Sequence, residues 1–179
     1  HITLLASVIL SSFITPQASA YSFLQTPDGN EPKWRSLPNT YQIGPLSKDL
    51  DEGQQIEAIH RSFETWAQVE GVKLIFEFDG FAEEGVSQND GANLIYFGNS
   101  GWDPESRAIA TTNNLAYTSG EVHGFDLPLN DENYVFTATD DPDLIQTDIQ
   151  NTITHEVGHI LGLSHSEDID ATMYTSTGL

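Results

Sequence analysis

Apolar residues in the first half of the chain recur with two different periods. From about Asp51 to about Val69 they recur every three or four residues, which predicts an amphipathic helix with an apolar face formed by Ile56, Ile59, Phe63 and Trp66. Three shorter segments are rich in β-branched and aromatic residues, which is typical of strands, and Gly, Asn, Asp and Ser are frequent between them. The predicted strands are Thr40–Ile43, Val72–Phe78 and Asn93–Phe97.

A second helix is predicted near the end of the chain, where every fourth position is apolar. Asp141 can cap its start, Pro142 suits its first turn, and Asp143 favours the positive end of the helix dipole. The predicted helix ends near Leu161, and its buried stripe consists of Ile145, Ile149, Ile153 and Val157. The order strand, helix, strands, helix predicts a single α+β domain.

The first twenty residues differ in character from the rest of the chain. The segment Ile2–Thr15 is apolar and uncharged, and it runs into the small residues Ala18, Ser19 and Ala20. A bilayer span needs about 20 apolar residues, so this run predicts a secretory signal peptide cleaved after Ala20, with no membrane anchor. A buried N-terminal helix is the alternative, because the chain begins with His1 and has no basic region before the apolar run.

Composition narrows the kinds of chemistry available to the chain. Its 179 residues suffice for one domain with a core, and they include no cysteine, which excludes disulfides, thiolate metal sites and cysteine nucleophiles. Any metal must therefore be held by imidazole and carboxylate groups. The formal charge of -21, from 27 acidic and 6 basic residues, would repel a phosphate backbone, so no nucleic-acid partner is expected.

The last predicted helix carries the sequence HEVGHILGLSH, from His155 to His165. At about 100° per residue, His155 points roughly away from the apolar stripe and His159 lies about 40° from it, so the two imidazoles share one face. Two such imidazoles can meet one ion with bonds of about 2.1 Å. Gly162 predicts a left-handed turn just past the helix, after which His165 can return as a third ligand. Three neutral nitrogens leave a fourth position for water, as in a catalytic zinc site.

Glu156 follows the first of these histidines without sharing their face. It can take a proton from a water molecule whose pKa zinc lowers, which predicts one catalytic Zn²⁺ with Glu156 as the general base. Agreement of five fixed positions by chance is on the order of one in 10⁴ for a chain of this length. A zinc site without catalysis remains the alternative.

The same motif resembles that of a known family. HEVGHILGLSH matches the HExxHxxGxxH motif of the metzincin zinc endopeptidases, and HSEDIDATMYTS after it resembles the matrixin branch. The resemblance extends to Trp34, SFETWAQVEGVKLIFE and NNLAYTSGEVHGFD, and so over most of Lys33–Ser176. It implies a metzincin-like α+β domain with a twisted, mostly parallel sheet, an antiparallel edge strand, two long helices and a small C-terminal subdomain.

The resemblance also implies roles for residues outside the zinc motif. Met173, the one methionine, lies eight residues after His165, where the Met-turn of the family lies beneath the metal. Tyr174 follows it directly, so no tyrosine ligand is implied. In the family, an edge strand that pairs with extended peptide substrate corresponds to Asn114, Leu115, Ala116 and Tyr117.

The chain departs from the animal matrixins at their structural zinc. Tyr117 stands where one of the histidine ligands of that zinc would fall, and the HGD element is replaced by NSGWDP at Asn99–Pro104. His123 is the one remnant of this ligand set. No structural zinc is therefore predicted. His60, on the first predicted helix, is interpreted as a packed or surface histidine.

Calcium and latency are two further hypotheses. The acidic segments Glu83–Asp90 and Asp126–Glu132 could supply oxygen ligands to Ca²⁺, although solvated loop charge is the commoner explanation because no EF-hand spacing is present. The cysteine switch of the family cannot form, and Asp28 is a candidate for a latency aspartate such as some bacterial relatives use. An ordinary Pro-Asp-Gly turn is the alternative for Asp28.

These observations predict three regions and one activity. Residues 1–20 are the signal peptide, 21–32 a short pro-segment or N-terminal extension, and 33–179 a catalytic domain truncated after the Met-turn, with an incomplete S1′ pocket. The predicted protein is a secreted, extracellular zinc endopeptidase acting on a peptide or protein substrate, with its oligomeric state open. The alternatives are a non-catalytic zinc-binding module that holds peptides or a cell surface, and a hydrolase of non-peptide amides.

Overall fold

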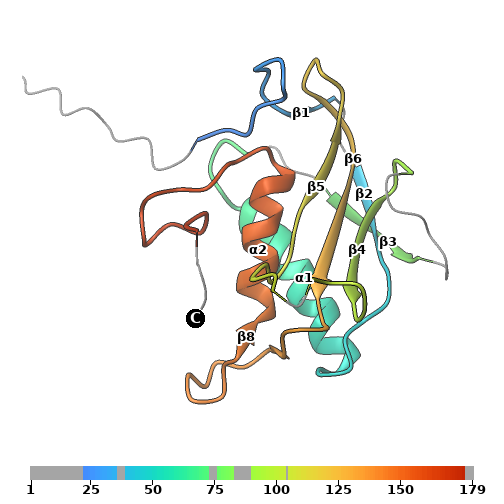
Figure 1. Cartoon of the computed structure of the whole chain (residues 1–179), viewed down its shortest axis with the longest axis vertical. Coiled ribbons are helices and arrows are strands. Elements are labelled where there is room, and N and C mark those ends of the chain that lie inside the picture. Colours follow the sequence, from blue (N-terminus) through green and yellow to red (C-terminus); the bar gives the residue numbers. More distant parts are fainter. Residues whose placement is uncertain (1–21, 36–38, 73–75, 83–89, 104, 176–179) are drawn as a thin grey trace, which may run out of the picture.

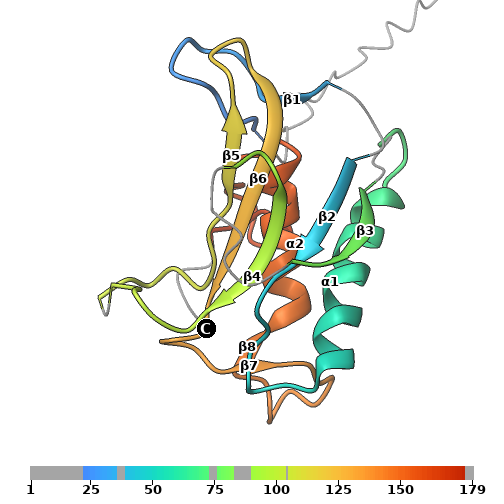
Figure 2. The same cartoon turned by 90° about the vertical axis from the view of Figure 1, so that its right-hand side faces the viewer.

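Two helices cover one face of a six-stranded sheet (Figure 1; Figure 2). The computed structural model describes residues 22–35, 39–72, 76–82, 90–103 and 105–175, so the predicted signal peptide lies outside the described residues. The sheet has the order β1-β6-β4-β2-β3, and β5 also pairs with β6. Its strands are β1 (Lys33–Trp34), β2 (Asn39–Ile43), β3 (Phe76–Phe81), β4 (Asn93–Gly98), β5 (Asn113–Ala116) and β6 (Glu121–Asn130). The remaining elements are α1 (Glu52–Ala67), α2 (Ile149–Ile160) and a small ladder of β7 (Phe136–Thr137) with β8 (Thr147–Asp148).

The pairing of the strands agrees with the predicted fold class. The pairs β1·β6, β4·β6, β2·β4 and β2·β3 are parallel, whereas β5 runs antiparallel to β6. The register of β5 runs from Asn113 opposite Asp126 to Ala116 opposite Val122. The α+β fold, with a mostly parallel sheet and an antiparallel edge strand, is confirmed.

The core forms where α1 and α2 pack together on the sheet. Ile59 of α1, Ile153 of α2 and Leu127 of β6 are all fully buried in it. Two tryptophans also donate hydrogen bonds to carbonyls of α2: Trp34 Nε1 to Ile160 O at 2.9 Å, and Trp66 Nε1 to Thr154 O at 2.8 Å. Apolar packing and these two bonds together fix the position of α2 in the domain.

The start of the second helix differs from the prediction. Its N-cap is Asp148, which accepts from Asn151 N at 2.9 Å, and α2 begins at Ile149. Asp141 accepts instead from Asp143 N in a turn, and Ile145 is 39% exposed, so neither belongs to the helix. The physical reason is tertiary: the segment just before α2 forms β8, which pairs with β7 and cannot be helical at the same time. The rest of the predicted stripe, Ile149, Ile153 and Val157, is buried.

The second acidic segment is a strand and not a loop. Within the predicted loop Asp126–Glu132, residues 126–130 belong to β6, and Asp126 is only 2% exposed. Leu127 and Leu129 are fully buried, and pairing with β4 on one edge and with residues 109–111 and β5 on the other outweighs the low strand propensity of Pro128. The solvated-loop interpretation is therefore wrong here. The other acidic segment lies almost entirely outside the described residues.

The other predicted elements need smaller corrections. The strands at Thr40–Ile43 and Asn93–Phe97 and the helix from Asp51 are confirmed to within a residue or two. The predicted strand Val72–Phe78 is wrong at its ends, because Val72 lies outside β3, residues 73–75 are not described, and β3 continues to Phe81. No helix among the described residues has the length and apolar character needed to cross a bilayer.

Candidate metal centre

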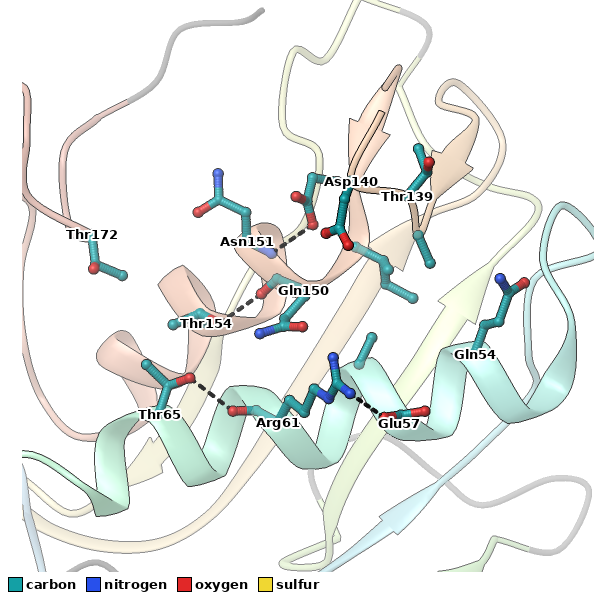
Figure 3. Close-up of a pocket in the computed structure, with 14 residues that line it drawn as sticks. Gln54, Glu57, Arg61, Thr65, Thr139, Asp140, Gln150, Asn151, Thr154 and Thr172 are labelled. Atoms are coloured by element: carbon teal, nitrogen blue, oxygen red, sulfur yellow. Dashed lines mark hydrogen bonds and ion pairs between the residues drawn. The ribbon is translucent and has the colours of Figure 1, made fainter. Parts of the chain in front are cut away.

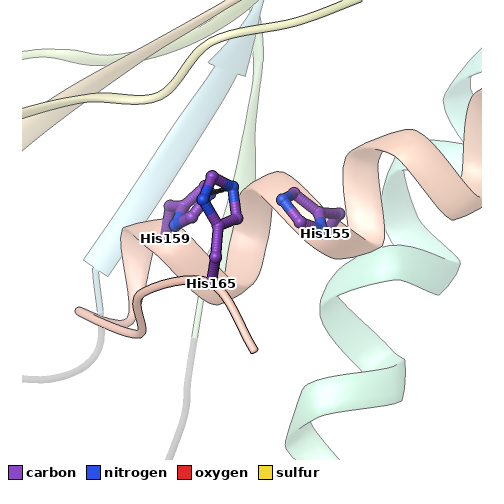
Figure 4. A group of neighbouring side chains, drawn as sticks. All are labelled: His155, His159 and His165. Atoms are coloured by element: carbon purple, nitrogen blue, oxygen red, sulfur yellow. Dashed lines mark hydrogen bonds between the residues drawn. The ribbon is translucent and has the colours of Figure 1, made fainter. Parts of the chain in front are cut away.

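Three imidazoles converge at the C-terminal half of α2 (Figure 4). His155 and His159 project from neighbouring turns of the helix, with ring centroids 4.9 Å apart. His165 returns from the loop that follows, and its Nε2 lies 3.2 Å from Nε2 of His159. One potential ligand atom from each of the three lies within 4.8 Å of the others. The structure thus brings together the three residues that the spacing singled out.

Backbone carbonyls orient two of these rings. Nδ1 of His155 lies 2.8 Å from Thr172 O, and Nδ1 of His159 lies 2.8 Å from Leu163 O. Since a carbonyl only accepts, each Nδ1 carries the proton and each Nε2 keeps a lone pair. Outer contacts of this kind fix the tautomer that a metal ligand requires.

The electrostatics of the cluster favour uncharged imidazoles. Burial lowers the pKa of His159, and the nearby His155 lowers it further against the opposing effect of the bond to Leu163 O. Burial also lowers the pKa of His165, as do the other two histidines, while Glu156 acts in the opposite direction. Neutral imidazole is the form that binds a metal ion.

Glu156 is a buried carboxylate beside the histidines. It is 7% exposed, and burial raises its pKa above the ordinary value. A hydrogen bond from Thr112 and the charges of His155 and His165 act in the opposite direction. Thr112 Oγ1 lies 2.7 Å from Glu156 Oε2. Sequence reasoning missed this contact, because a lone threonine has no diagnostic spacing.

Met173 lies against the helix that carries the histidines. It is 3% exposed, and a Cβ built on Gly158 would lie 2.1 Å from its Sδ. The turn is closed by Ser166 N, which donates to Met173 O at 2.7 Å. Gly158 is therefore the residue that permits this close approach, and nothing in the sequence distinguished it from any other glycine.

The chain turns sharply after α2 at Gly162, as predicted. Gly162 has a φ of 90°, and a Cβ there would lie 3.0 Å from Pro32 O. The N-terminal segment runs antiparallel beside this turn: Leu24 N donates to Gly162 O at 2.8 Å, and Ser164 N donates to Ser22 O at 2.7 Å. Residues 22–24 thus contact the loop that carries His165.

Asp28 lies farther along this N-terminal segment, in an exposed turn. Gly29 N donates to Thr26 O at 2.8 Å across that turn. Asp28 is not among the residues whose potential ligand atoms gather with the histidines. Its role in latency stays a prediction.

The predicted substrate strand lies next to α2. Asn114, Leu115 and Ala116 belong to β5, and Asn114 Nδ2 donates to His159 O at 2.7 Å. Tyr117 lies beyond the strand, 57% exposed, with its ring 4.6 Å from that of His123. His60 packs elsewhere, on α1, with its ring 5.2 Å from that of Phe78.

A cavity among the described residues lies away from the histidines. It has a volume of about 600 Å³ and lies between α1 and the first turns of α2 (Figure 3). Figure 3 shows an ion pair of Arg61 with Glu57 in its wall. Thr172 lies in its wall and also contacts the cluster, because Thr172 O lies 2.8 Å from His155 Nδ1. The chemical groups therefore indicate the histidine cluster, and not this cavity, as the functional site.

Comparison with known proteins gives consistent matches over most of the chain. The family model described as Matrixin matches residues 33–178. Interstitial collagenase from Oryctolagus cuniculus is 31% identical over 153 residues, covering 85% of this chain and 30% of the relative. Matrix metalloproteinase-15 from Homo sapiens is 28% identical over 145 residues, covering 79% of this chain and 21% of the relative. Metalloendoproteinase 1 from Glycine max is 28% identical over 165 residues, covering 88% of this chain and 48% of the relative. The chain thus spans less than half the length of each of these relatives.

Proposed function

Because this chain belongs to the matrixin family of zinc-dependent endopeptidases, we propose that it hydrolyses internal bonds of extended peptides, with Glu156 as the general base. The observation that carries the proposal is the convergence of three histidines beside this buried carboxylate. Neither the ligand roles of the histidines nor the role of Glu156 follows from family membership alone.

The donor set fits a zinc ion held by His155, His159 and His165. Tetrahedral zinc with bonds of about 2.1 Å needs nitrogens about 3.4 Å apart. The Nε2 atoms of His159 and His165 are 3.2 Å apart, and the three potential ligand atoms lie within 4.8 Å of one another. Two lone pairs facing each other at 3.2 Å repel unless a cation or a proton lies between them. The lowered pKa values of both histidines disfavour imidazolium, and neutral imidazole is the form that can bind a metal ion.

Glu156 supplies the proton chemistry in this proposal. Bound zinc would act as a Lewis acid that polarises the scissile carbonyl and lowers the pKa of the attacking water. Glu156 takes a proton from that water as the new C–O bond forms, and it gives the proton to the leaving nitrogen as the C–N bond breaks. Its raised pKa makes the carboxylate a stronger base toward the attacking water, and the amine nitrogen of the leaving group is basic enough to take the proton back.

The substrate, in this proposal, extends the sheet at β5. This strand pairs with β6 along one edge, and a peptide in extended form can add to the other by main-chain hydrogen bonds. Asn114 joins β5 to α2 through His159 O, so a peptide on this edge would lie at a set distance from the histidines. Side-chain preference is then decided by the pockets beside the strand.

Secretion is the second part of the proposal. It rests on the apolar segment at residues 2–15 followed by Ala18, Ser19 and Ala20, which is typical of a signal peptide. The test is expression with and without residues 1–20. Secretion is supported if the protein is cleaved after Ala20 and reaches the medium only when residues 1–20 are present. It is contradicted if both forms of the protein stay in the cells.

The proposed activity is tested by zinc content and peptide cleavage. The protein from Tyr21 onward, Glu156→Ala and the exposed-site control Glu70→Ala are loaded with zinc and incubated with a quenched peptide library. We expect one zinc per chain in all three, and cleavage that is lost about 10²- to 10⁴-fold only in the Glu156 variant. One zinc per chain without cleavage in any of them would contradict the peptidase and favour a non-catalytic binding module.

A further inference from the structure

We propose that Thr112 is the positioning residue of the general base. Its hydroxyl holds the Glu156 carboxylate through Oε2 and leaves Oε1 as the oxygen that accepts a proton. This inference rests on the proposed function of Glu156. It assigns a role to a residue that belongs neither to the HEVGHILGLSH motif nor to β5.

The contacts at Thr112 single out the carboxylate as its partner. Thr112 Oγ1 lies 2.7 Å from Glu156 Oε2 and 3.1 Å from the backbone oxygen of the same residue. A hydroxyl has one proton to donate, and the shorter, charge-assisted bond to the carboxylate is the stronger of the two. Because Glu156 is only 7% exposed, bulk water has little access to replace that bond.

The backbone around Thr112 is fixed on both sides. Before it, Ala110 pairs with Leu129, and Thr111 N donates to Pro128 O at 3.1 Å, so the chain is anchored on β6. After it, β5 begins at Asn113. The hydroxyl is thus presented from the sheet, and not from a flexible loop, which makes it a suitable restraint on a side chain of α2.

Thr112 also joins the base to the strand proposed to bind substrate. Thr112 and Asn114 are alternate residues, so they project to the same side of an extended chain. Their side chains reach the backbone oxygens of Glu156 and His159, which are one helical turn apart on α2. A peptide paired with β5 would therefore be held in register with the base, whose carboxylate Thr112 restrains through the bond to Oε2.

The test compares two substitutions of Thr112 with one of its neighbour. Thr112→Val removes the hydroxyl and keeps the shape of the side chain, whereas Thr112→Ser keeps the hydroxyl. Thr111→Val is the matched control, because Thr111 makes no hydrogen bond to Glu156 among the described residues. We expect kcat of Thr112→Val to fall about 10- to 100-fold, with KM and zinc content unchanged. Thr112→Ser and Thr111→Val should keep kcat close to wild type. A KM effect alone, loss of zinc, or a serine variant as slow as the valine variant would overturn the proposal.

A measurement without catalysis tests the same contact. The free energy of unfolding is measured for the zinc-loaded wild type, Thr112→Val, Glu156→Ala and the double variant. If the hydroxyl acts on the carboxylate, Thr112→Val destabilises the protein less when Glu156 is already alanine. Additive effects of the two changes would overturn the inference. Should the valine variant not fold, Thr112→Ala replaces it in both experiments.

The two proposals fail in different ways. If wild type does not cleave peptides, the proposed activity fails, while the coupling between Thr112 and Glu156 in unfolding remains measurable. If wild type cleaves, Glu156→Ala does not, and Thr112→Val has the kcat of wild type, only the positioning role fails.

Discussion

Replacement of Gly158 by alanine tests whether Met173 supports the metal centre from beneath α2. A Cβ at Gly158 would lie 2.1 Å from Met173 Sδ, 3.0 Å from Met173 Cε and 3.0 Å from Trp66 Cζ2. Ordinary contact begins at 3.4 Å, so the sulfur must move by about 1.3 Å, the difference between 3.4 and 2.1 Å. Met173 is 3% exposed and has little free space into which to move.

Two opposing effects decide the magnitude. Overpacking of a buried site costs about 1–3 kcal/mol. Alanine is a better helix former than glycine by about 0.5–1 kcal/mol, which offsets part of that cost. We therefore expect Gly158→Ala to lower the free energy of unfolding by about 1–2 kcal/mol. Zinc affinity should fall about 10- to 100-fold, because Thr172, next to Met173, holds the ring of His155 through its carbonyl.

The assay is urea unfolding of the zinc-loaded protein together with zinc competition by a chelator. Met173→Ala provides the control, because it removes both methionine atoms that crowd the new Cβ. In that background Gly158→Ala should cost clearly less than in wild type, since only the contact with Trp66 Cζ2 at 3.0 Å then opposes the helix propensity of alanine. If Gly158→Ala were neutral or stabilising with Met173 present, the close approach of Met173 to α2 would be refuted.

Three further predictions follow from other contacts. Burial and the charge of Glu64 raise the pKa of Tyr41 above 10.0, so the unfolded chain loses the phenolic proton first and the free energy of unfolding falls as pH rises above about 10. Tyr41→Phe should flatten that decline in urea midpoints measured between about pH 8 and about pH 11, and an equally steep decline would contradict the assignment. Trp34→Phe removes the bond to Ile160 O and should cost about 1–2 kcal/mol in urea unfolding, a loss that an unchanged midpoint would disprove. Deletion of residues up to 30 removes the backbone bonds to 162–164 and should speed zinc release to a chelator; unchanged release would instead favour a dispensable pro-segment.

Local sequence patterns located the three converging histidines because these residues lie close together in the chain. His155 and His159 are four residues apart on one helix, and Gly162 turns the chain so that His165 returns to them. Helix periodicity and one left-handed glycine suffice for this arrangement, so the sequence predicted it. The same periodicity located most of α1 and the buried stripe of α2.

Elements that depend on distant partners were missed or misplaced. The start of α2 is decided by pairing of β8 with β7, about ten residues earlier in the chain. The segment Asp126–Glu132 was predicted to be an acidic loop, but most of it is a strand, because β4 pairs with it on one edge and residues 109–111 and β5 pair with it on the other. An apolar pattern reports burial of a segment but carries little information about the strand that buries it.

The sequence by itself therefore determined the fold class, the three histidines and the adjacent glutamate, since these follow from local spacing and from a motif. Only the tertiary structure decided what surrounds them: the hydroxyl of Thr112 on Glu156, Met173 against Gly158, and residues 22–24 beside the loop of His165. Thr112 and Glu156 are 44 residues apart, and the N-terminal segment is 143 residues from His165. Contacts over such separations are made by the packing of the whole domain, and no local rule of spacing encodes them.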